Sequence, residues 1–234
     1  GHLTLPFRVH IPGQDTSLST RRIWTLDLHD SDGHRGRGIA APLAGFSAEG
    51  ADEVEGALRT LCDTSGPLVG TPVNSLEAIH ALVRATQCPA SVMHAVEQAL
   101  LDLLASRRST TVCALLGGVT DALPYHALIS DPWSAQLAIA RGAAAIKVKV
   151  GGGHDALQGV QAIRDAVGPQ VQLHLDVNGG WSLEEALDHL PQLEALGVAL
   201  IEEPLAERDL LGMAQLCQAT AIVIAADESC RTAA

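Results

Sequence analysis

The feature that most constrains the fold is a series of four short apolar runs between Ala145 and Ser229, each ending in residues able to do chemistry. The runs read AIKVKV (145–150), LHLDVN (173–178), ALIEEP (199–204) and IVIAADES (222–229). A segment with helical apolar spacing follows each of the first three, and such alternation predicts parallel βαβ units. One charged residue stands near the end of each run, at intervals of 27, 26 and 25 residues: Lys149, Asp176, Glu202 and Asp227. Functional groups of a parallel barrel collect at the C-terminal ends of its strands, so we expect these side chains to face a common mouth.

The composition limits the class of partner. The chain has 234 residues, of which 47% are hydrophobic and 18% charged, and this indicates a globular protein. A net charge of −12 argues against nucleic-acid and anionic-membrane partners, which favour a basic face. The five cysteines are odd in number and lack CxxC spacing, which suits reduced thiols in the cytoplasm. We therefore expect a cytoplasmic protein without a nucleic-acid or membrane partner.

The first part of the chain carries strand signals and then helix signals. Alternating patterns predict strands at Leu5–Ile11 and Trp24–His29, and the turn Asp30–Gly33 leads into a third. The polar stretch Pro12–Thr20 is predicted to be a loop. Three helices follow, beginning after Ser47, at Asn74-Ser75 and at Pro89–Ser91, and Ser47 is a candidate cap of the first. The predicted buried positions on these helices are Val54, Leu58 and Leu61; Ile79 and Leu82; and Val92, Val96, Leu100, Leu103 and Leu104. Residues 1–120 are thus predicted to form an α+β capping domain.

From residue 121 the pattern changes to strand followed by helix. The predicted strands are Leu123–Ile129, Lys147–Val150, Val171–Asp176, a run ending at Glu202, and Ile222–Asp227. The predicted helices are Trp133–Arg141, Asp155–Val167, Leu183–Leu196 and Leu210–Ala219. A (β/α)₈ barrel needs eight strands and about 250 residues. Residues 121–234 are therefore predicted to form a TIM-type (β/α) barrel domain that is incomplete in this chain, with its C-terminal strands absent.

The strand-end residues suggest a metal site. Three carboxylates at one mouth would repel each other unless a cation lay among them, and oxygen ligands favour Mg²⁺, or Mn²⁺ in its place, over zinc. Lys147 and Lys149 are two residues apart on a strand and so point to the same face. Because like charges disfavour each other's protonation, one of the two can act as a neutral base near pH 7. A cation that stabilises an enediolate makes the α-carbon of a carboxylate substrate more acidic.

These motifs resemble the enolase superfamily, in its muconate-lactonizing subgroup. The residues that carry the resemblance are Lys147-Val-Lys149, Asp176-Val-Asn178, Ile201-Glu-Glu-Pro204 and Ala226-Asp-Glu-Ser229. The segment Gly38–Ser47 contains Pro-Leu-Ala-Gly-Phe-Ser, which resembles a loop of the o-succinylbenzoate synthases of menaquinone biosynthesis. The resemblance implies an enolase-like fold: an N-terminal capping domain followed by the barrel.

The resemblance also implies roles. Lys149 would be the acid/base, and Lys147 would favour the neutral form of Lys149 and contact the substrate carboxylate. The metal ligands would be Asp176, Glu202 and Asp227. Asn178, Phe46 and Ser47 would lie near the substrate, and Pro12–Thr20 would match a loop that closes over it.

The reaction implied is a Mg²⁺-dependent syn dehydration of 2-succinyl-6-hydroxy-2,4-cyclohexadiene-1-carboxylate to o-succinylbenzoate, which makes the chain a carbon–oxygen lyase. Two alternatives stay open. One is a dipeptide epimerase or N-acylamino-acid racemase of the same subgroup, which moves a proton on and off one carbon. The other is a non-catalytic, truncated fragment. The sequence leaves the oligomeric state undetermined.

Overall fold

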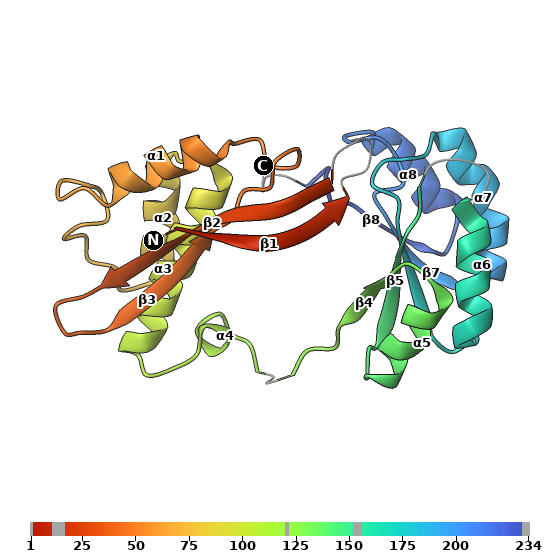
Figure 1. The fold of residues 1–234 in the computed structure, drawn as a ribbon, viewed down its shortest axis with the longest axis horizontal. Coiled ribbons are helices and arrows are strands. Elements are labelled where there is room, and N and C mark those ends of the chain that lie inside the picture. Colours follow the sequence, from red (N-terminus) through yellow and green to blue (C-terminus); the bar gives the residue numbers. More distant parts are fainter. Residues whose placement is uncertain (1, 11–16, 120–121, 152–155, 231–234) are drawn as a thin grey trace. The chain divides into compact units, whose positions relative to one another are not determined.

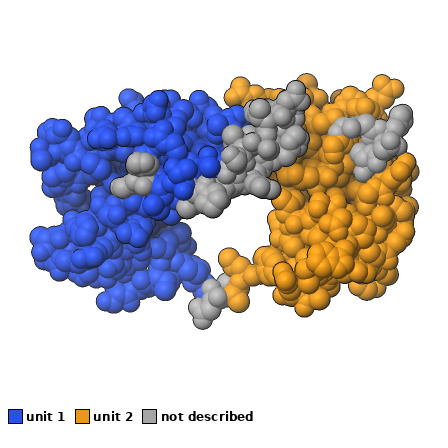
Figure 2. All heavy atoms as spheres, viewed as in Figure 1, with its two compact units in different colours: residues 1–121 blue, residues 122–234 orange. Residues whose placement is uncertain are grey.

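The structure is a computed structural model that describes residues 2–10, 17–119, 122–151 and 156–230. It contains two compact units, Gly1–Asp121 and Ala122–Ala234, which Figure 2 distinguishes by colour. Within the predicted loop Pro12–Thr20, residues 12–16 lie outside the described part, whereas Ser17–Thr20 belong to a strand. Ile11 and Asp155, predicted to lie in a strand and a helix, are also outside it.

Unit 1 is an antiparallel sheet with helices packed on one face (Figure 1). Its elements are β1 (His2–His10), β2 (Ser17–His29), β3 (Arg35–Ala40), α1 (Ala51–Leu61), α2 (Leu76–Thr86), α3 (Ala90–Arg107) and the short α4 (Val112–Leu115). The strand order is β1-β2-β3. The three predicted strands and three predicted helices are present, whereas α4 was not predicted.

The faces of β2 and β3 that meet the helices differ in side-chain size. Trp24 and Leu26 of β2 are buried and pair in register with Ala40 and Gly38 of β3. The alternation of β3, with every second residue buried, leaves Gly36, Gly38 and Ala40 as its inner face. A Cβ atom built on Gly38 would lie 1.8 Å from the carbonyl oxygen of Ala95 in α3. The strand and the backbone of α3 are therefore in direct contact, which only glycine permits.

Helix α3 also covers the outer edge of β3. The Arg37 amide donates to Oδ2 of Asp102 (2.9 Å), and the Ile39 amide donates to Oε1 of Gln98 (2.9 Å). These two amides point away from β2, so without α3 they would form an open sheet edge. Polar side chains of a helix thus take the place of a fourth strand.

The helix start predicted at Asn74-Ser75 is correct. Ser75 precedes α2, and its side chain accepts a hydrogen bond from the Ala78 amide (3.2 Å). Ser47 was predicted to cap α1, and this is wrong: α1 begins at Ala51, Gly50 is its N-cap, and there is no side-chain cap. Ser47 instead accepts a hydrogen bond from the Leu43 amide (3.0 Å), because the chain makes a local turn there before the helix begins.

Unit 2 is a five-stranded parallel sheet in the order β4-β5-β6-β7-β8. Its elements are β4 (His126–Ile129), α5 (Pro132–Ala140), β5 (Ala145–Lys149), α6 (Ala156–Val167), β6 (Gln172–Asp176), α7 (Leu183–Ala195), β7 (Val198–Glu202), α8 (Leu210–Ala219) and β8 (Val223–Ala225). This alternation confirms the predicted part-barrel architecture. Strand β8 is shorter than predicted, so Asp227 lies two residues beyond its end.

The two faces of this sheet have different chemistry. Figure 1 shows α5 to α8 along one face, and the side chains on that face form the core of the unit. The central members of that core are Ile146, Val148, Leu173, Leu175 and Ile201. Alternation along each strand places Lys147, Lys149 and Asp176 on the opposite face. No described helix is long and apolar enough to cross a membrane.

The N-terminal end of the sheet is held by one buried arginine. Arg164, near the end of α6, is 8% exposed and hydrogen-bonds four backbone carbonyls at 2.6 to 3.2 Å. They belong to Gly168, Val171, Leu196 and Gly197. Burial lowers the pKa of Arg164. The side chain joins the loop before β6 to the loop before β7.

We expect Arg164→Met to lower the free energy of unfolding by roughly 3 kcal/mol or more. Methionine keeps the apolar stem but leaves several carbonyls without a donor, at a cost of about 1–3 kcal/mol for each one that water cannot reach. Urea unfolding followed by circular dichroism measures the loss. The exposed Arg141 provides the control, because Arg141→Met is expected to change stability by no more than about 0.5 kcal/mol. Equal stabilities for the two variants would contradict the role of Arg164.

Candidate active site

The sheet register brings three of the predicted residues to one level. Lys149 pairs with Asp176, and Asp176 pairs with Glu202, along the adjacent strands β5, β6 and β7. Partners in a parallel ladder face the same side, so the three side chains emerge together at the C-terminal end of the sheet. Asp227 reaches this end from the loop after β8.

Lys147 lies between two carboxylates. Its Nζ donates to Oε1 of Glu202 at 2.7 Å and lies 3.0 Å from Oδ2 of Asp176. Burial lowers the pKa of Lys147, but the hydrogen bonds and charges of Glu202 and Asp176 outweigh it, so the pKa is raised above its ordinary value. Asp176 and Glu202 therefore favour the charged form of Lys147, which leaves Lys149 as the candidate base.

Lys149 is the more accessible lysine, with its side chain 43% exposed against 15% for Lys147. Its Nζ donates to Oδ1 of Asn178 (2.9 Å) and lies 3.7 Å from Oδ2 of Asp176. Lys149 also lines a pocket of about 330 Å³ together with Leu128, Ile129, Ser130 and Ser134. These two are the only lysines of the sequence, which otherwise uses arginine.

The amide of Asn178 is oriented by groups on both sides. Its Oδ1 accepts from Lys149, and its Nδ2 donates to Oε1 of Glu228 (2.9 Å). The backbone of Asn178 is left-handed, with φ of 49°, and Gly179 follows at 72°. This turn aims the side chain back toward the strand ends. Glu228 has no role in the sequence prediction, although it directly follows the predicted ligand Asp227.

The carboxylates fit a hard divalent cation. Asp176 is 3% exposed, and its Oδ1 is buried with no hydrogen-bond partner in the part of the chain that the structure describes. A buried carboxylate oxygen needs a donor or a cation, and an oxygen-only donor set suits Mg²⁺. The pKa of Asp227 is raised, first by partial burial and then by the charge of Glu202, although the residue keeps an exposed surface. A cation beside Asp176, Glu202 and Asp227 would relieve this repulsion.

A different acidic cluster has the tighter geometry. In the described residues, the set of three possible ligands whose atoms all lie within 4.8 Å of one another is Asp30, Asp32 and His34, not the predicted trio. The carboxylate of Asp30 already accepts from the amides of Asp32 (3.0 Å) and His34 (2.9 Å) and contacts the His34 ring. These bonds close the β2–β3 turn, so we assign the cluster to turn formation.

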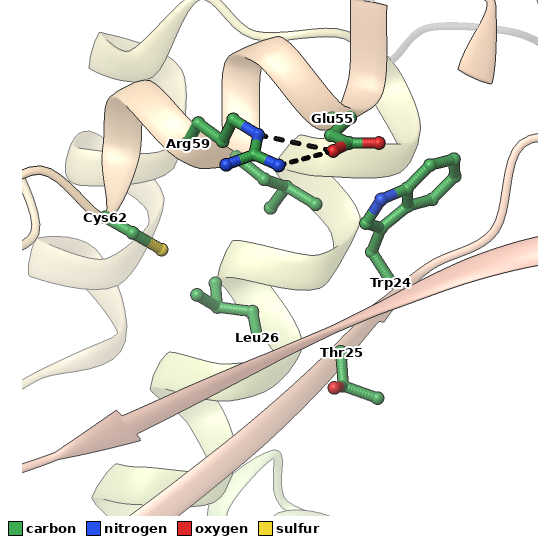
Figure 3. Close-up of a pocket in the computed structure, with 7 residues that line it drawn as sticks. Trp24, Thr25, Leu26, Glu55, Arg59 and Cys62 are labelled. Atoms are coloured by element: carbon green, nitrogen blue, oxygen red, sulfur yellow. Dashed lines mark hydrogen bonds and ion pairs between the residues drawn. The ribbon is translucent and has the colours of Figure 1, made fainter. Parts of the chain in front are cut away.

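A pocket in unit 1 is lined by none of the predicted catalytic residues. It has a volume of about 250 Å³ and lies between β2 and α1, where Trp24, Leu26, Glu55, Arg59 and Cys62 line it (Figure 3). Its charged groups are paired, since Nη2 of Arg59 donates to Oε1 of Glu55 at 2.7 Å. The pocket contains neither a clustered set of acids nor a base beside a nucleophile. The strand-end site therefore remains the candidate active site.

The predicted substrate contacts Phe46 and Ser47 belong to unit 1, in the turn before α1. Their role stays a prediction. Sequence reasoning also missed a histidine pair on the sheet: Nδ1 of His126 lies 3.3 Å from Nδ1 of His174. Burial lowers the pKa of His174, and His126 and Lys147 add to this effect. The sequence did offer one sign of this pair: His174 lies two residues before Asp176, so both side chains are on the same face of β6.

The chain is similar to known proteins over nearly its full length. Residues 133–234 match the family model described as enolase C-terminal domain-like. The L-Ala-D/L-Glu epimerase of Bacillus subtilis (strain 168) is 31% identical over 238 residues, which cover 97% of this chain and 63% of the relative. A solved substrate-liganded complex of the L-Ala-D/L-Glu epimerase from Bacillus subtilis superposes with a TM-score of 0.85 at 27% identity, over 98% of this chain and 66% of that one. The dipeptide epimerase from Cytophaga hutchinsonii, solved with Mg and the dipeptide D-Ala-L-Val, gives 0.77 at 29% identity, over 92% and 60%.

The sheet, its helices and these neighbours define an enolase-like α/β fold. Residues 133–234, somewhat less than half of the chain, are similar to the enolase C-terminal domain-like family. The predicted fold class is confirmed, and the similarities agree with the predicted superfamily. The chain spans 63% of the length of the Bacillus subtilis relative.

Proposed function

We propose that this chain belongs to a Mg²⁺-dependent epimerase that removes and returns the α-proton of a dipeptide or an N-acylated amino acid. The observation that carries the proposal is the aligned set Lys149, Asp176 and Glu202 at three adjacent strand ends. The named relatives support the substrate class, because both are dipeptide epimerases. They support this alternative better than the o-succinylbenzoate synthase predicted from the capping loop.

The roles follow from the contacts of each side chain. Lys149, the exposed member of the pair, accepts the α-proton, and Asn178 orients its amine through the 2.9 Å hydrogen bond. Lys147 stays protonated between Asp176 and Glu202 and presents positive charge to the substrate carboxylate. Bound Mg²⁺, held by Asp176, Glu202 and Asp227, would make the α-proton more acidic by stabilising negative charge on that carboxylate.

Epimerisation also needs an acid on the opposite face of the α-carbon. Both lysines of this sequence lie on β5, so neither can serve that face while the other acts as the base. The resemblance to the subgroup suggests a lysine on the strand after the Asp-Glu-Ser strand. Removal and return of the proton on the same face of the α-carbon requires Lys149 alone. Proton exchange and full epimerisation can therefore be tested separately.

The test is deuterium uptake at the α-carbon. The purified protein is incubated in D₂O with Mg²⁺ and L-Ala-L-Glu, and proton NMR follows the glutamyl α-proton and the diastereomeric dipeptide. We expect the α-proton signal to decay, to stop decaying when EDTA removes the metal, and to resume when Mg²⁺ is restored. Decay with the second diastereomer would indicate a complete epimerase, and decay without it would indicate the Lys149 half of the reaction.

The dehydratase makes the opposite prediction. If the protein converts 2-succinyl-6-hydroxy-2,4-cyclohexadiene-1-carboxylate to o-succinylbenzoate and leaves the α-protons of a dipeptide panel unexchanged, the epimerase proposal fails. Inactivity toward both substrates, with no Mg²⁺ binding by calorimetry, would instead favour the non-catalytic fragment.

A further inference from the structure

Glu203 is a buried carboxylate that neither the proposed metal set nor the proposed chemistry uses. It directly follows Glu202, and it is 1% exposed. Its backbone is left-handed, with φ of 40°, a conformation that costs free energy for any residue other than glycine. Such a conformation persists where surrounding contacts hold it in place.

Both oxygens of Glu203 accept hydrogen bonds from the loop after β8. Its Oε2 accepts from the backbone amides of Asp227 (2.6 Å) and Ser229 (3.2 Å), and its Oε1 accepts from the hydroxyl of Ser229. The Ser229 hydroxyl oxygen in turn accepts from the Arg208 amide (2.9 Å). One carboxylate thus joins the loop after β7 to the loop after β8.

The position of Asp227 depends on the hydrogen bond from its amide to Glu203, because no bond of the sheet holds the Asp227 amide. Strand β8 ends at Ala225, whose carbonyl accepts the last ladder bond, from the Glu203 amide (2.8 Å). The Asp227 amide lies beyond the ladder and donates to the Glu203 carboxylate. The side chain of Asp227 must still face the like charges of Asp176 and Glu202, which would drive a loosely held loop away.

We propose that Glu203 is a positioning residue that fixes Asp227 for metal binding and thereby sets the affinity of the site for Mg²⁺. The inference rests on the proposed metal role of Asp227 and adds a determinant of that role. It also accounts for the charge at position 203, since the three groups that hydrogen-bond the carboxylate are all donors. Glutamine at that position would turn an NH₂ group toward a backbone amide or toward the Ser229 hydroxyl.

The experiment measures Mg²⁺ affinity by isothermal titration calorimetry on the purified protein without substrate. We expect Glu203→Gln to raise the Kd for Mg²⁺ by about 10- to 100-fold, the usual effect of removing a group that orients a ligand. Ser229→Ala, which removes one of the three donors, is expected to raise the Kd by a smaller factor. Glu184→Gln makes the same chemical change at an exposed site on α7 and is expected to leave the Kd unchanged.

A double-mutant cycle separates positioning from a general loss of structure. If Glu203 acts through Asp227, Glu203→Gln adds no further loss of affinity in an Asp227→Asn background. A residue that only supports the fold would weaken binding in both backgrounds. Equal losses in the two backgrounds would overturn the inference. Where Glu203→Gln does not fold, as judged by circular dichroism, the same cycle with Ser229→Ala decides.

A wrong positioning role for Glu203 and a wrong ligand role for Asp227 would give different results. If Asp227→Asn weakens Mg²⁺ binding and Glu203→Gln does not, Asp227 stays a ligand and the positioning role of Glu203 is wrong. If Asp227→Asn binds Mg²⁺ as tightly as the parent protein, the ligand set of the proposed function is wrong, and the inference falls with it.

Discussion

Replacing Lys149 with alanine is expected to lower kcat for α-proton exchange by about 10²- to 10⁴-fold, the range that a positioned acid/base contributes. The effect should fall on kcat more than on KM, because Lys149 acts on the proton while Lys147 and the metal ligands hold the substrate. The free energy of unfolding should change little, since the side chain is 43% exposed. Initial rates of deuterium uptake, measured alongside a urea titration, check both expectations.

Two companion variants isolate the chemistry of Lys149 from its charge. Lys149→Arg keeps a cation, but the guanidinium stays protonated at neutral pH, so this variant should be as slow as the alanine variant. Lys147→Met removes the charge between Asp176 and Glu202 and should raise KM and alter metal binding. Full activity of Lys149→Arg would contradict the assignment of Lys149 as the base.

Gly38→Ala is expected to destabilise unit 1 by about 3 kcal/mol or more, which exceeds the usual cost of one extra methyl group in a core. The added Cβ would lie 1.8 Å from the carbonyl oxygen and 2.7 Å from the carbonyl carbon of Ala95. These are backbone atoms of α3, so the helix itself must move. That movement would also disturb the hydrogen bonds that the Arg37 and Ile39 amides of β3 donate to Asp102 and Gln98.

Gly56 provides the matched control in the same unit. It lies within α1, and a Cβ added there meets no atom within 4 Å. Gly56→Ala should therefore stabilise the protein by about 0.5–1 kcal/mol, since alanine favours the helix. Thermal and urea unfolding of the two variants should move in opposite directions. A Gly38→Ala variant as stable as the parent would show that β3 and α3 are not in close contact.

The strand ends of the site could be predicted because they depend on local pattern. Alternation fixes which side of a strand each residue occupies, and near-equal intervals fix one residue per βα unit. Together these rules bring Lys149, Asp176 and Glu202 to one level without knowledge of any other contact. The buried faces of the helices follow from the same logic: Val54, Leu58 and Leu61 are buried as predicted, whereas Leu82 and Leu103 are only partly buried.

The remaining features depend on partners distant in sequence. Ser47 has the right chemistry for a cap, but its local turn takes the hydroxyl oxygen first. Glu203 looks like a second copy of Glu202, and only the fold of the loop after β8 shows that its carboxylate faces amides rather than the mouth of the site. Gly38 resembles many other strand glycines until α3 is in place. Composition and periodicity carry no information about such contacts between residues that are distant in sequence.

The restriction of lysine to two neighbouring positions has a practical consequence for covalent labelling. Within this sequence, reagents that acylate primary amines find side-chain amines only at Lys147 and Lys149. Because Lys147 is the less exposed of the two and is held by Asp176 and Glu202, an acylating probe should mark Lys149 first. The mass added to a single peptide would then count occupied sites, and protection by a bound substrate could be read without a catalytic assay.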